Sequence, residues 1–431
     1  MKISVPVIKL GSPEAVKLLK AMKLARSATN ETVQHTVDVI LADVRKNGDT
    51  ELCAYTKKFD GVTLTPATIA IRASEIKAQA KKASPQLKGA LEQAARRIRT
   101  YHARQKSVAF GITTKEGKLW QRVRPLSRIG VYVPGGYTVY PSSVLMDIIP
   151  AQIAGVAEIA VVTPPRGGLD PKIACALDIL QVKEVYRVGG AQAIAALAYG
   201  TGRIKSVDKI VGPGNSYVAL AKKAVYGSVD IDTVAGPSEV VILADASVKA
   251  EWAALDMLAQ AEHGSGNESA VCVTEDAAFA ARLKASLERE MARSPVSEVF
   301  KRLKPGALCI CIAASRDESI QFVNECAPEH LQLMTKTYKA DLEKITNASA
   351  VFCGAFTPVA LGDYYIGTNH VLPTGGAARF ASPLGVDSFV KRMSVAEVSE
   401  AGLRLCAANV SLLARAENFV HHALSVERRV L

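Results

Sequence analysis

The sequence lacks the features that mark membrane, secreted and many nucleic-acid-binding proteins. No run reaches the roughly 18 uninterrupted apolar residues of a membrane helix, and the start MKISVPVIKLGSPEAVKLLK lacks the apolar core of a signal peptide. The eight cysteines form no CxxC pair, and most stand in apolar runs. The net charge of +12 comes without a basic stripe interleaved with aromatics. We therefore expect a cytoplasmic protein with reduced core cysteines and with neither membrane nor nucleic acid as a partner.

Histidine is also scarce, because the chain has only seven. Four of them follow a carboxylate or amide side chain at short spacing, which suggests a metal-dependent enzyme. Each pair also has a structural interpretation, such as a helix cap in the first case or an exposed surface pair in the second. The pairs are Gln260 and His263, Glu329 and His330, Asp363 and His370, and Glu417 and His422.

The length of 431 residues favours more than one domain. The chain up to about Arg128 reads as helices with a strand-like segment over 62–72, and Ser84 and Pro85 are placed to cap and open one helix. From Ile129, β-branched runs such as EIAVVTPP alternate with amphipathic helices, and the rhythm resumes after Gly236 with EVVILAD. This pattern predicts two parallel α/β modules, followed by a helical segment over 395–419.

Glycine-rich turns follow several of the predicted strands. In an open α/β sheet, ligands bind at the carboxyl ends of the strands, and glycine lets backbone N–H groups approach a phosphate. The dinucleotide fingerprint GxGxxG is not met, because Tyr217 stands where its third glycine belongs. The glycines alone leave nucleotide binding and ordinary tight turns open. The turns are Pro134–Gly136, Gly189–Gly190 and Gly212–Asn215.

Gln260 and His263 can share one face at the end of a helix that Gly264 stops, because they are three positions apart. Zinc needs about four donors, and Asp363, in a predicted Gly-Asp-Tyr-Tyr turn, and His422 are the best candidates to complete the set. The glycine-rich loop 367–376 also reads as functional. Since a chain end normally frays, ligands near the C-terminus would need a second subunit to hold them.

Eight segments in order, spanning about 129–426, resemble the signature blocks of the histidinol dehydrogenase family. They are GVYVPGGYTVYPSSVLM, RVGGAQAIAALAYGT, DKIVGPGNSYVALAKKAV, AGPSEVVILAD, LAQAEHG, CAPEHLQL, LGDYYIGTNHVLPTGG and ENFVHHALSV. The resemblance implies two Rossmann-like parallel α/β domains with helical N-terminal and C-terminal extensions. It divides the chain into an arm of 1–26, a zinc and catalytic domain of 27–131 plus 239–383, an NAD domain of 132–238, and a tail of 384–431.

The resemblance also implies an activity and a set of site residues. The activity is a four-electron oxidation of L-histidinol to L-histidine through L-histidinal, with two NAD molecules and one zinc ion per subunit, in a homodimer that exchanges its tails. His330 would be the proton acceptor and Glu329 would activate water. The zinc ligands would be Gln260, His263, Asp363 and His422. These four residues and His330 would also contact the substrate, together with Ser238, His370 and Glu417. The NAD contacts would be Tyr132, Gln192 and Asn215.

Some alternatives stay beside this interpretation. His421 could be the ligand in place of His422 if the tail helix rotated by about 100°. Relatives of the family oxidise other small polar alcohols, including sulfonated diols, with a similar zinc ion and Glu-His pair. A nucleotide- or nucleic-acid-binding protein with a structural zinc would need basic residues at the glycine turns, but GAQAIAAL and GPSEVVIL are neutral or acidic.

Overall fold

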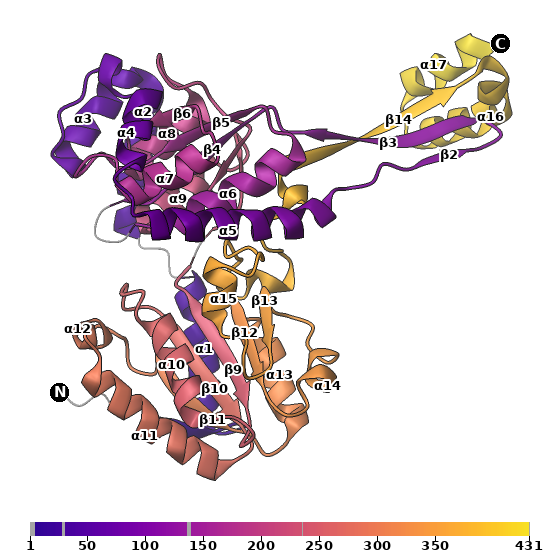
Figure 1. Cartoon of the computed structure of the whole chain (residues 1–431). Coiled ribbons are helices and arrows are strands. Elements are labelled where there is room, and N and C mark those ends of the chain that lie inside the picture. The colour runs from indigo at the N-terminus through magenta and orange to yellow at the C-terminus, as the bar shows by residue number, and fades with distance from the viewer. Residues whose placement is uncertain (1–4, 28–30, 136–138, 235, 431) are drawn as a thin grey trace.

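The computed structural model of the protein describes residues 5–27, 31–135, 139–234 and 236–430. Residues 1–4 of the expected N-terminal arm and Gly136 of the first predicted glycine turn lie outside the described residues. The chain forms two α/β lobes, one above the other in Figure 1, and a long arm that projects from the upper lobe. The prediction of two parallel α/β modules is confirmed.

The upper lobe contains a five-stranded parallel sheet in the order β6-β5-β4-β7-β8. Its central strands β4 and β7 are buried along their whole length, as expected for a parallel sheet covered on both faces. Each strand and helix predicted between residues 129 and 226 is present. The strands are β4 (Arg128–Tyr132), β5 (Glu158–Val162), β6 (Glu184–Tyr186), β7 (Lys209–Val211) and β8 (Asp230–Ile231), and the helices are α6 (Pro141–Ala154), α7 (Pro171–Ile179), α8 (Gly190–Tyr199) and α9 (Ser216–Val225).

The N-terminal helices pack on this same sheet, which differs from the predicted grouping of 27–131 with 239–383. Leu91 and Ile98 of α5 join the core of Val131 on β4, because their i and i+7 spacing places them on one helix face. The expected strand over 62–72 is also wrong: this segment holds the short 3₁₀ helix Pro66–Thr68 and a single bridge from Ala70. These helices are α2 (Glu31–Asn47), α3 (Asp49–Asp60), α4 (Ala73–Ala80) and α5 (Pro85–His102).

The Ser84 cap is confirmed, since its hydroxyl oxygen accepts a hydrogen bond of 3.2 Å from the N–H of Leu87, and Pro85 opens α5. A cap of this kind satisfies one of the free N–H groups at a helix start.

The lower lobe contains a six-stranded parallel sheet in the order β1-β11-β10-β9-β12-β13. Its first strand comes from the N-terminal arm, so residues 7–9 extend this sheet at its edge. The strands are β1 (Val7–Lys9), β9 (Glu239–Ala244), β10 (Ser269–Thr274), β11 (Leu308–Ile312), β12 (His330–Met334) and β13 (Ala350–Cys353). The helices are α1 (Pro13–Ser27), α10 (Ala250–Ala261), α11 (Ala277–Arg293), α12 (Ser297–Phe300), α13 (Arg316–Cys326), α14 (Tyr338–Leu342) and α15 (Val359–Tyr364).

The arm joins two segments far apart in the sequence. An antiparallel sheet of β2 (Gly111–Thr113), β3 (Gly117–Pro125) and β14 (Val390–Val398) carries α16 (Glu400–Ala416) and α17 (Val420–Val430) at its far end (Figure 1). The predicted helix over 395–419 is therefore wrong in its first turn, which belongs to β14. Two short 3₁₀ helices, Ala377–Arg379 and Val386–Phe389, precede the arm.

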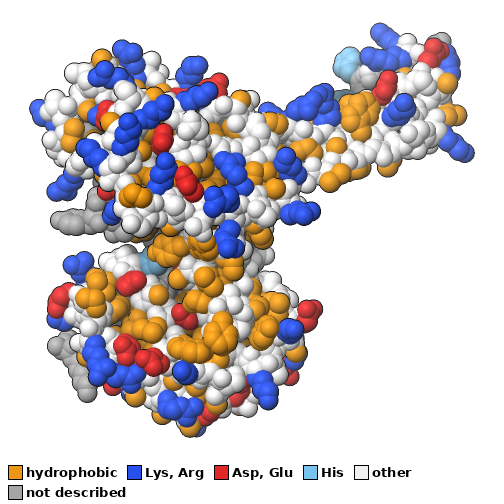
Figure 2. Space-filling view, viewed as in Figure 1, with side chains coloured by type: hydrophobic (Ala, Val, Ile, Leu, Met, Phe, Trp, Pro, Cys, Tyr) orange, Lys and Arg blue, Asp and Glu red, His pale blue; other side chains and the backbone are white. Residues whose placement is uncertain are grey.

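The arm leaves many large apolar side chains in contact with solvent. Leu412 and Leu413 on α16 are 69% and 65% exposed, and Phe110 before β2 is 61% exposed. Figure 2 shows apolar side chains spread along the arm and histidine atoms at its tip. Exposed apolar side chains in such number are typical of a surface that contacts another molecule.

None of the described helices combines the length and the apolar character that crossing a bilayer requires. A cytoplasmic location stays a prediction. Six of the eight cysteines are buried, as expected for core residues.

Candidate functional site

A cavity with a volume of about 950 Å³ lies between the two lobes. Its upper wall contains glycine turns at the carboxyl ends of the five-stranded sheet. Its lower wall contains Ser238, just before β9, and His330, the first residue of β12, at the amino ends of the six-stranded sheet. Nine of the predicted site residues line it: Tyr132, Gln192, Asn215, Ser238, His263, Glu329, His330, Asp363 and His370.

The backbone of Glu239 holds the predicted catalytic pair. Its N–H donates a hydrogen bond of 2.9 Å to Oε2 of Glu329, and its carbonyl oxygen lies 3.3 Å from Nδ1 of His330. A carbonyl oxygen can only accept, so this contact requires the proton of the neutral His330 ring to lie on Nδ1. Nε2 is then free to take a proton, and it faces Oδ1 of Asp363 at 3.6 Å.

Burial and neighbouring charge act in opposite directions on this pair. The Glu329 and His330 side chains are only 7% and 5% exposed, and Oε2 of Glu329 lies 3.6 Å from Nδ1 of His330. Burial raises the pKa of Glu329, although His330 opposes the shift. Burial alone would lower the pKa of His330, but the carboxylates of Glu329 and Asp363 outweigh it and raise that pKa. Both changes make these groups better proton acceptors at neutral pH.

Gln260 and His263 stand at the end of α10, as predicted. Nδ1 of His263 donates to the carbonyl oxygen of Gln260 at 3.0 Å, which leaves Nε2 available to a metal. Asp363 lies in the short helix α15 instead of the predicted turn. Burial would raise the pKa of Asp363, but the hydrogen bond and charge of His330, with smaller effects from His370 and His263, lower it, so its carboxylate form is favoured.

These three residues supply donor types that zinc accepts, but fewer than it commonly takes. The Gln260 side chain is buried and its Nε2 has no hydrogen-bond partner among the described residues, so no hydrogen bond fixes the orientation of the amide, whose oxygen is the atom able to bind a metal. Among those same residues, no group of three or more His, Cys, Asp or Glu side chains could hold a metal. One amide, one imidazole and one carboxylate fall short of the four donors that zinc commonly takes.

The remaining predicted ligand and substrate contact lie on the arm, and neither lines the cavity. Glu417 follows α16 as its C-terminal cap, His422 belongs to α17, and both are exposed. The His422 ring packs against Phe419 with a centroid distance of 5.0 Å. Within one chain, therefore, the structure does not bring these two residues to the others.

The glycine turns carry the predicted NAD contacts. The hydroxyl of Tyr132 accepts a hydrogen bond of 3.1 Å from the N–H of Gly190, and burial raises the pKa of Tyr132 to about 12. Oε1 of Gln192 is buried without a partner among the described residues. Asn215 caps α9 by accepting from the N–H of Val218 at 3.2 Å. A helix start with free N–H groups and an unused buried amide oxygen fit a polar cofactor.

The predicted functional loop 367–376 connects to both walls. Nδ1 of His370 donates to the carbonyl oxygen of Asp363 at 2.7 Å, so Nε2 accepts from the hydroxyl of Ser143 at 2.9 Å. The N–H of Gly375 donates to Oε1 of Glu239 at 3.0 Å. Sequence reasoning missed Ser143 and Glu239, because no local pattern indicates that they contact residues more than a hundred positions away.

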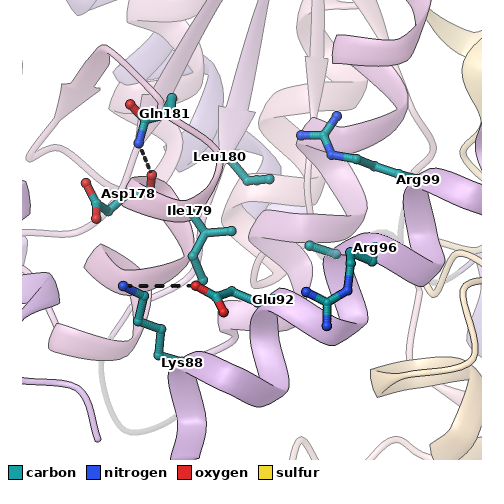
Figure 3. Close-up of a pocket in the computed structure, with 9 residues that line it drawn as sticks. Lys88, Glu92, Arg96, Arg99, Asp178, Ile179, Leu180 and Gln181 are labelled. Carbon is teal, nitrogen blue, oxygen red and sulfur yellow. Dashed lines mark hydrogen bonds and ion pairs between the residues drawn. The ribbon is translucent and has the colours of Figure 1, made fainter. Parts of the chain in front are cut away.

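A second, smaller cavity of about 390 Å³ lies between α5 and the end of α7 (Figure 3). Lys88 and Glu92 form an ion pair of 4.0 Å at its rim, and no predicted site residue lines it. Exposed pairs of this kind contribute little. The chemistry is therefore assigned to the large cavity.

Comparisons with known proteins show the family and the fold of the chain. A model of the histidinol dehydrogenase family matches residues 24–430. Histidinol dehydrogenase of Bacillus cereus strain ATCC 10987 is 46% identical over 422 residues, covering 96% of this chain and 97% of the relative. That of Gluconobacter oxydans strain 621H is 44% identical over 408 residues, covering 94% and 95%. The crystal structure of histidinol dehydrogenase from Elizabethkingia anophelis superimposes with a TM-score of 0.91 at 34% identity, covering 100% of this chain and 98% of that one.

Proposed function

The chain belongs to the histidinol dehydrogenase family, and on that premise we propose that it oxidises L-histidinol to L-histidine through L-histidinal. The observation that carries the proposal is the position of the buried Glu329–His330 pair. It shares one cavity with His263 and Asp363 below and with the glycine turns above. A cavity with a proton acceptor, polar ligand groups and a cofactor edge suits an alcohol oxidation.

His330 takes the proton in the first oxidation. As the alcohol carbon of histidinol loses a hydride and becomes an aldehyde, the alcohol proton passes to Nε2 of His330. The bond from Nδ1 to the carbonyl oxygen of Glu239 fixes the ring so that Nε2 faces the cavity. The carboxylate of Asp363, at 3.6 Å, stabilises the imidazolium that forms.

Glu329 acts between the two oxidations. It takes a proton from water as the water oxygen adds to the aldehyde carbon, and the imidazolium of His330 returns its proton to the carbonyl oxygen. The result is a hydrated aldehyde with two hydroxyl groups and a neutral His330. That carbon then loses a second hydride while His330 takes a hydroxyl proton, and the product is the carboxylic acid. The raised pKa of Glu329, caused by burial, makes it a stronger base than an exposed carboxylate.

The residues that hold the cofactors follow from the fit described above. Gln260, His263, Asp363 and His422 would bind zinc, which would supply a fixed point for the polar groups of the substrate. Tyr132, Gln192 and Asn215 would bind NAD, which would supply the hydride acceptor. Ser238, His370 and Glu417 would contact the substrate.

We propose further that two chains form a homodimer with shared sites. His422 and Glu417 would reach the cavity of the partner, since both are exposed on the arm while the zinc set of one chain lacks a donor. The exposed apolar residues of the arm support this arrangement, because pairing would remove them from water.

The proposal is tested by the stoichiometry of the reaction. L-Histidinol is consumed with NAD, and NADH, L-histidinal and L-histidine are measured with and without a metal chelator. We expect two NADH and one L-histidine per L-histidinol, with loss of activity on metal removal and recovery with added zinc. One NADH per substrate with accumulating aldehyde, or full activity without metal, would contradict the proposal.

A further inference from the structure

A buried ion pair lies directly beneath one of the glycine turns. The Lys222 side chain on α9 and the Asp232 side chain after β8 are 2% and 3% exposed, and they pair with each other. A Lys–Asp pair in the interior must compensate for the loss of hydration of both charges, and apolar residues would often be as stable there. Its presence therefore calls for a role beyond packing.

The pair binds both backbone groups of Gly212. The N–H of Gly212 donates to Oδ2 of Asp232 at 2.8 Å, and Nζ of Lys222 donates to the carbonyl oxygen of Gly212 at 2.9 Å. The ladder between β4 and β7 ends at Val211, so the strands leave these groups unpaired. Bonds to charged partners are shorter and stronger than neutral ones.

Gly212 itself has little freedom to move. Its φ of 111° lies in a region that side-chain-bearing residues rarely adopt, and a Cβ there would collide with the carbonyl oxygen of Tyr132. The turn is thus pressed against the end of β4 and held from below by two charges. Three residues later, Asn215 begins α9 and faces the cavity.

A third ionisable group belongs to this cluster. Asp147 on α6 is fully buried, and neither of its carboxyl oxygens has a hydrogen-bond partner among the described residues. Burial, and then the charge of Asp232, raises the pKa of Asp147, while Lys222 opposes the shift. Asp147 therefore holds a proton more readily than an exposed aspartate, while Lys222 and Asp232 pair with each other beneath the turn.

We propose that Lys222 and Asp232 are positioning residues for the dinucleotide: they fix the turn 212–215 in the conformation that receives the cofactor. This inference rests on the proposed function, since it takes that turn as part of the NAD site. Both side chains border the cavity but are almost completely buried, and their bonds go to the backbone of Gly212, so we infer that the pair acts through the turn that leads to the cap Asn215.

The test compares two lysine-aspartate pairs at opposite ends of the neighbouring strands β7 and β8. Lys222→Met removes the charge beneath the turn. Lys209→Met is the matched control, because Lys209 at the start of β7 is also buried and forms an ion pair of 2.9 Å with Asp230, but at the opposite end of the strand from the turn. For each variant, the KM for NAD, the KM for L-histidinol, kcat, the Kd for NADH and the melting temperature are measured.

We expect Lys222→Met to raise the KM for NAD and the Kd for NADH by about tenfold, which is the effect of one lost hydrogen bond to a charged group. The KM for L-histidinol should stay within about twofold. Lys209→Met should lower the melting temperature without a change in the KM for NAD. If Lys222→Met does not fold, Asp232→Asn keeps the side-chain size and decides the question, with the same shift expected.

A folded variant with the parental KM for NAD and Kd for NADH would overturn the inference. An equal loss for NAD and L-histidinol would also overturn it, because it would indicate a general structural role. The proposed function fails in a different way: the unsubstituted protein would then form no NADH from L-histidinol and bind none.

Discussion

The exchange of tails between two subunits can be tested by combining two inactive proteins. His330→Ala damages the cavity of its own chain and leaves the arm intact. His422→Ala damages only the arm, since His422 is exposed on α17 and does not line the cavity of its own chain. The His330→Ala homodimer should be inactive, because loss of a general base alone lowers the rate by about 10²–10⁴-fold. The His422→Ala homodimer should be inactive, because each of its proposed zinc sites lacks one ligand.

The expected recovery follows from the arrangement of the sites. If every site combines the cavity of one chain with the arm of the other, a mixed dimer has one site with both lesions and one with none. Random mixing of equal amounts makes about half of all dimers mixed, so about one quarter of the parental activity should return in the mixture and about one half in the isolated mixed dimers. The assay is NADH formation after the two proteins, carrying different affinity tags, are unfolded, mixed and refolded, and the mixed dimers isolated.

A matched control uses two lesions in the same half of the site. Glu329→Gln mixed with His330→Ala should not restore L-histidine formation, which is measured in both mixtures, because both residues lie in the cavity of their own chain and each site of the mixed dimer keeps one lesion. Inactive mixed dimers of the first pair would refute the exchange of tails. Equal recovery in the control pair would show that the return of activity has another cause.

Three further outcomes follow from the site. Glu329→Gln should slow the second oxidation by about 10²–10⁴-fold and lower the yield from two NADH toward one, with L-histidinal trapped by a hydroxylamine; equal slowing of both oxidations would contradict the separate role of Glu329. His263→Asn should weaken zinc binding by at least about tenfold, measured by metal analysis after dialysis against a chelator, and full zinc retention would exclude it as a ligand. Asp147→Asn tests the buried carboxyl beside Asp232. Because the pKa of Asp147 is raised in the folded state, the parental protein loses stability as the pH rises from the ordinary aspartate range through that raised value. At neutral pH the variant should therefore be more stable than the parental protein by about 1 kcal/mol in the free energy of unfolding. The difference should vanish in acid. Urea unfolding across pH measures it, and a constant difference at every pH would contradict the raised pKa.

The alternating strands and helices after Ile129 were predictable because their burial is strong and local. Strands such as β4 and β9 are buried at every residue, so they appear as β-branched runs between turn residues. The helix after residue 250 is amphipathic, and its end at Gln260 and His263 follows from the glycine beyond it. Local pattern and final structure agree wherever one short segment contains the whole signal.

The arm was not predictable from local pattern, since its strands pair across most of the chain. Arg122 on β3 lies opposite Met393 on β14, and most residues of both strands are exposed or half-buried. Without a buried face, no alternation of apolar and polar residues marks these strands. The apolar faces of the helices over 31–102 are visible in the sequence, but the sequence does not indicate on which of the two sheets they pack.

Asp147 gave a signal that pattern reasoning passed over. It stands alone in the apolar helix SSVLMDIIPAQIAGV, where a charged residue contradicts the surrounding pattern. A buried charge is costly unless it has a partner or a function. Lys222 gave a weaker signal, because the sequence AKKAV does not show which lysine points inward.

The site itself departs from the usual rule for parallel sheets in one lobe only. The glycine turns lie at the carboxyl ends of the upper sheet, as the rule predicts, but His330 and Glu239 begin β12 and β9 and so lie at the amino ends of the lower sheet. At the carboxyl ends of that lower sheet, Arg316 forms ion pairs of 2.9 Å with Glu275 and 3.9 Å with Asp245. Glu275 follows β10 and Asp245 follows β9, so both carboxylates pair with Arg316 at the edge where a ligand would otherwise bind. The lower lobe therefore faces the upper lobe with the amino ends of its strands. The cavity lies between the carboxyl ends of the upper sheet and the Glu329–His330 pair of the lower lobe, and local sequence pattern could not have shown that these two parts meet.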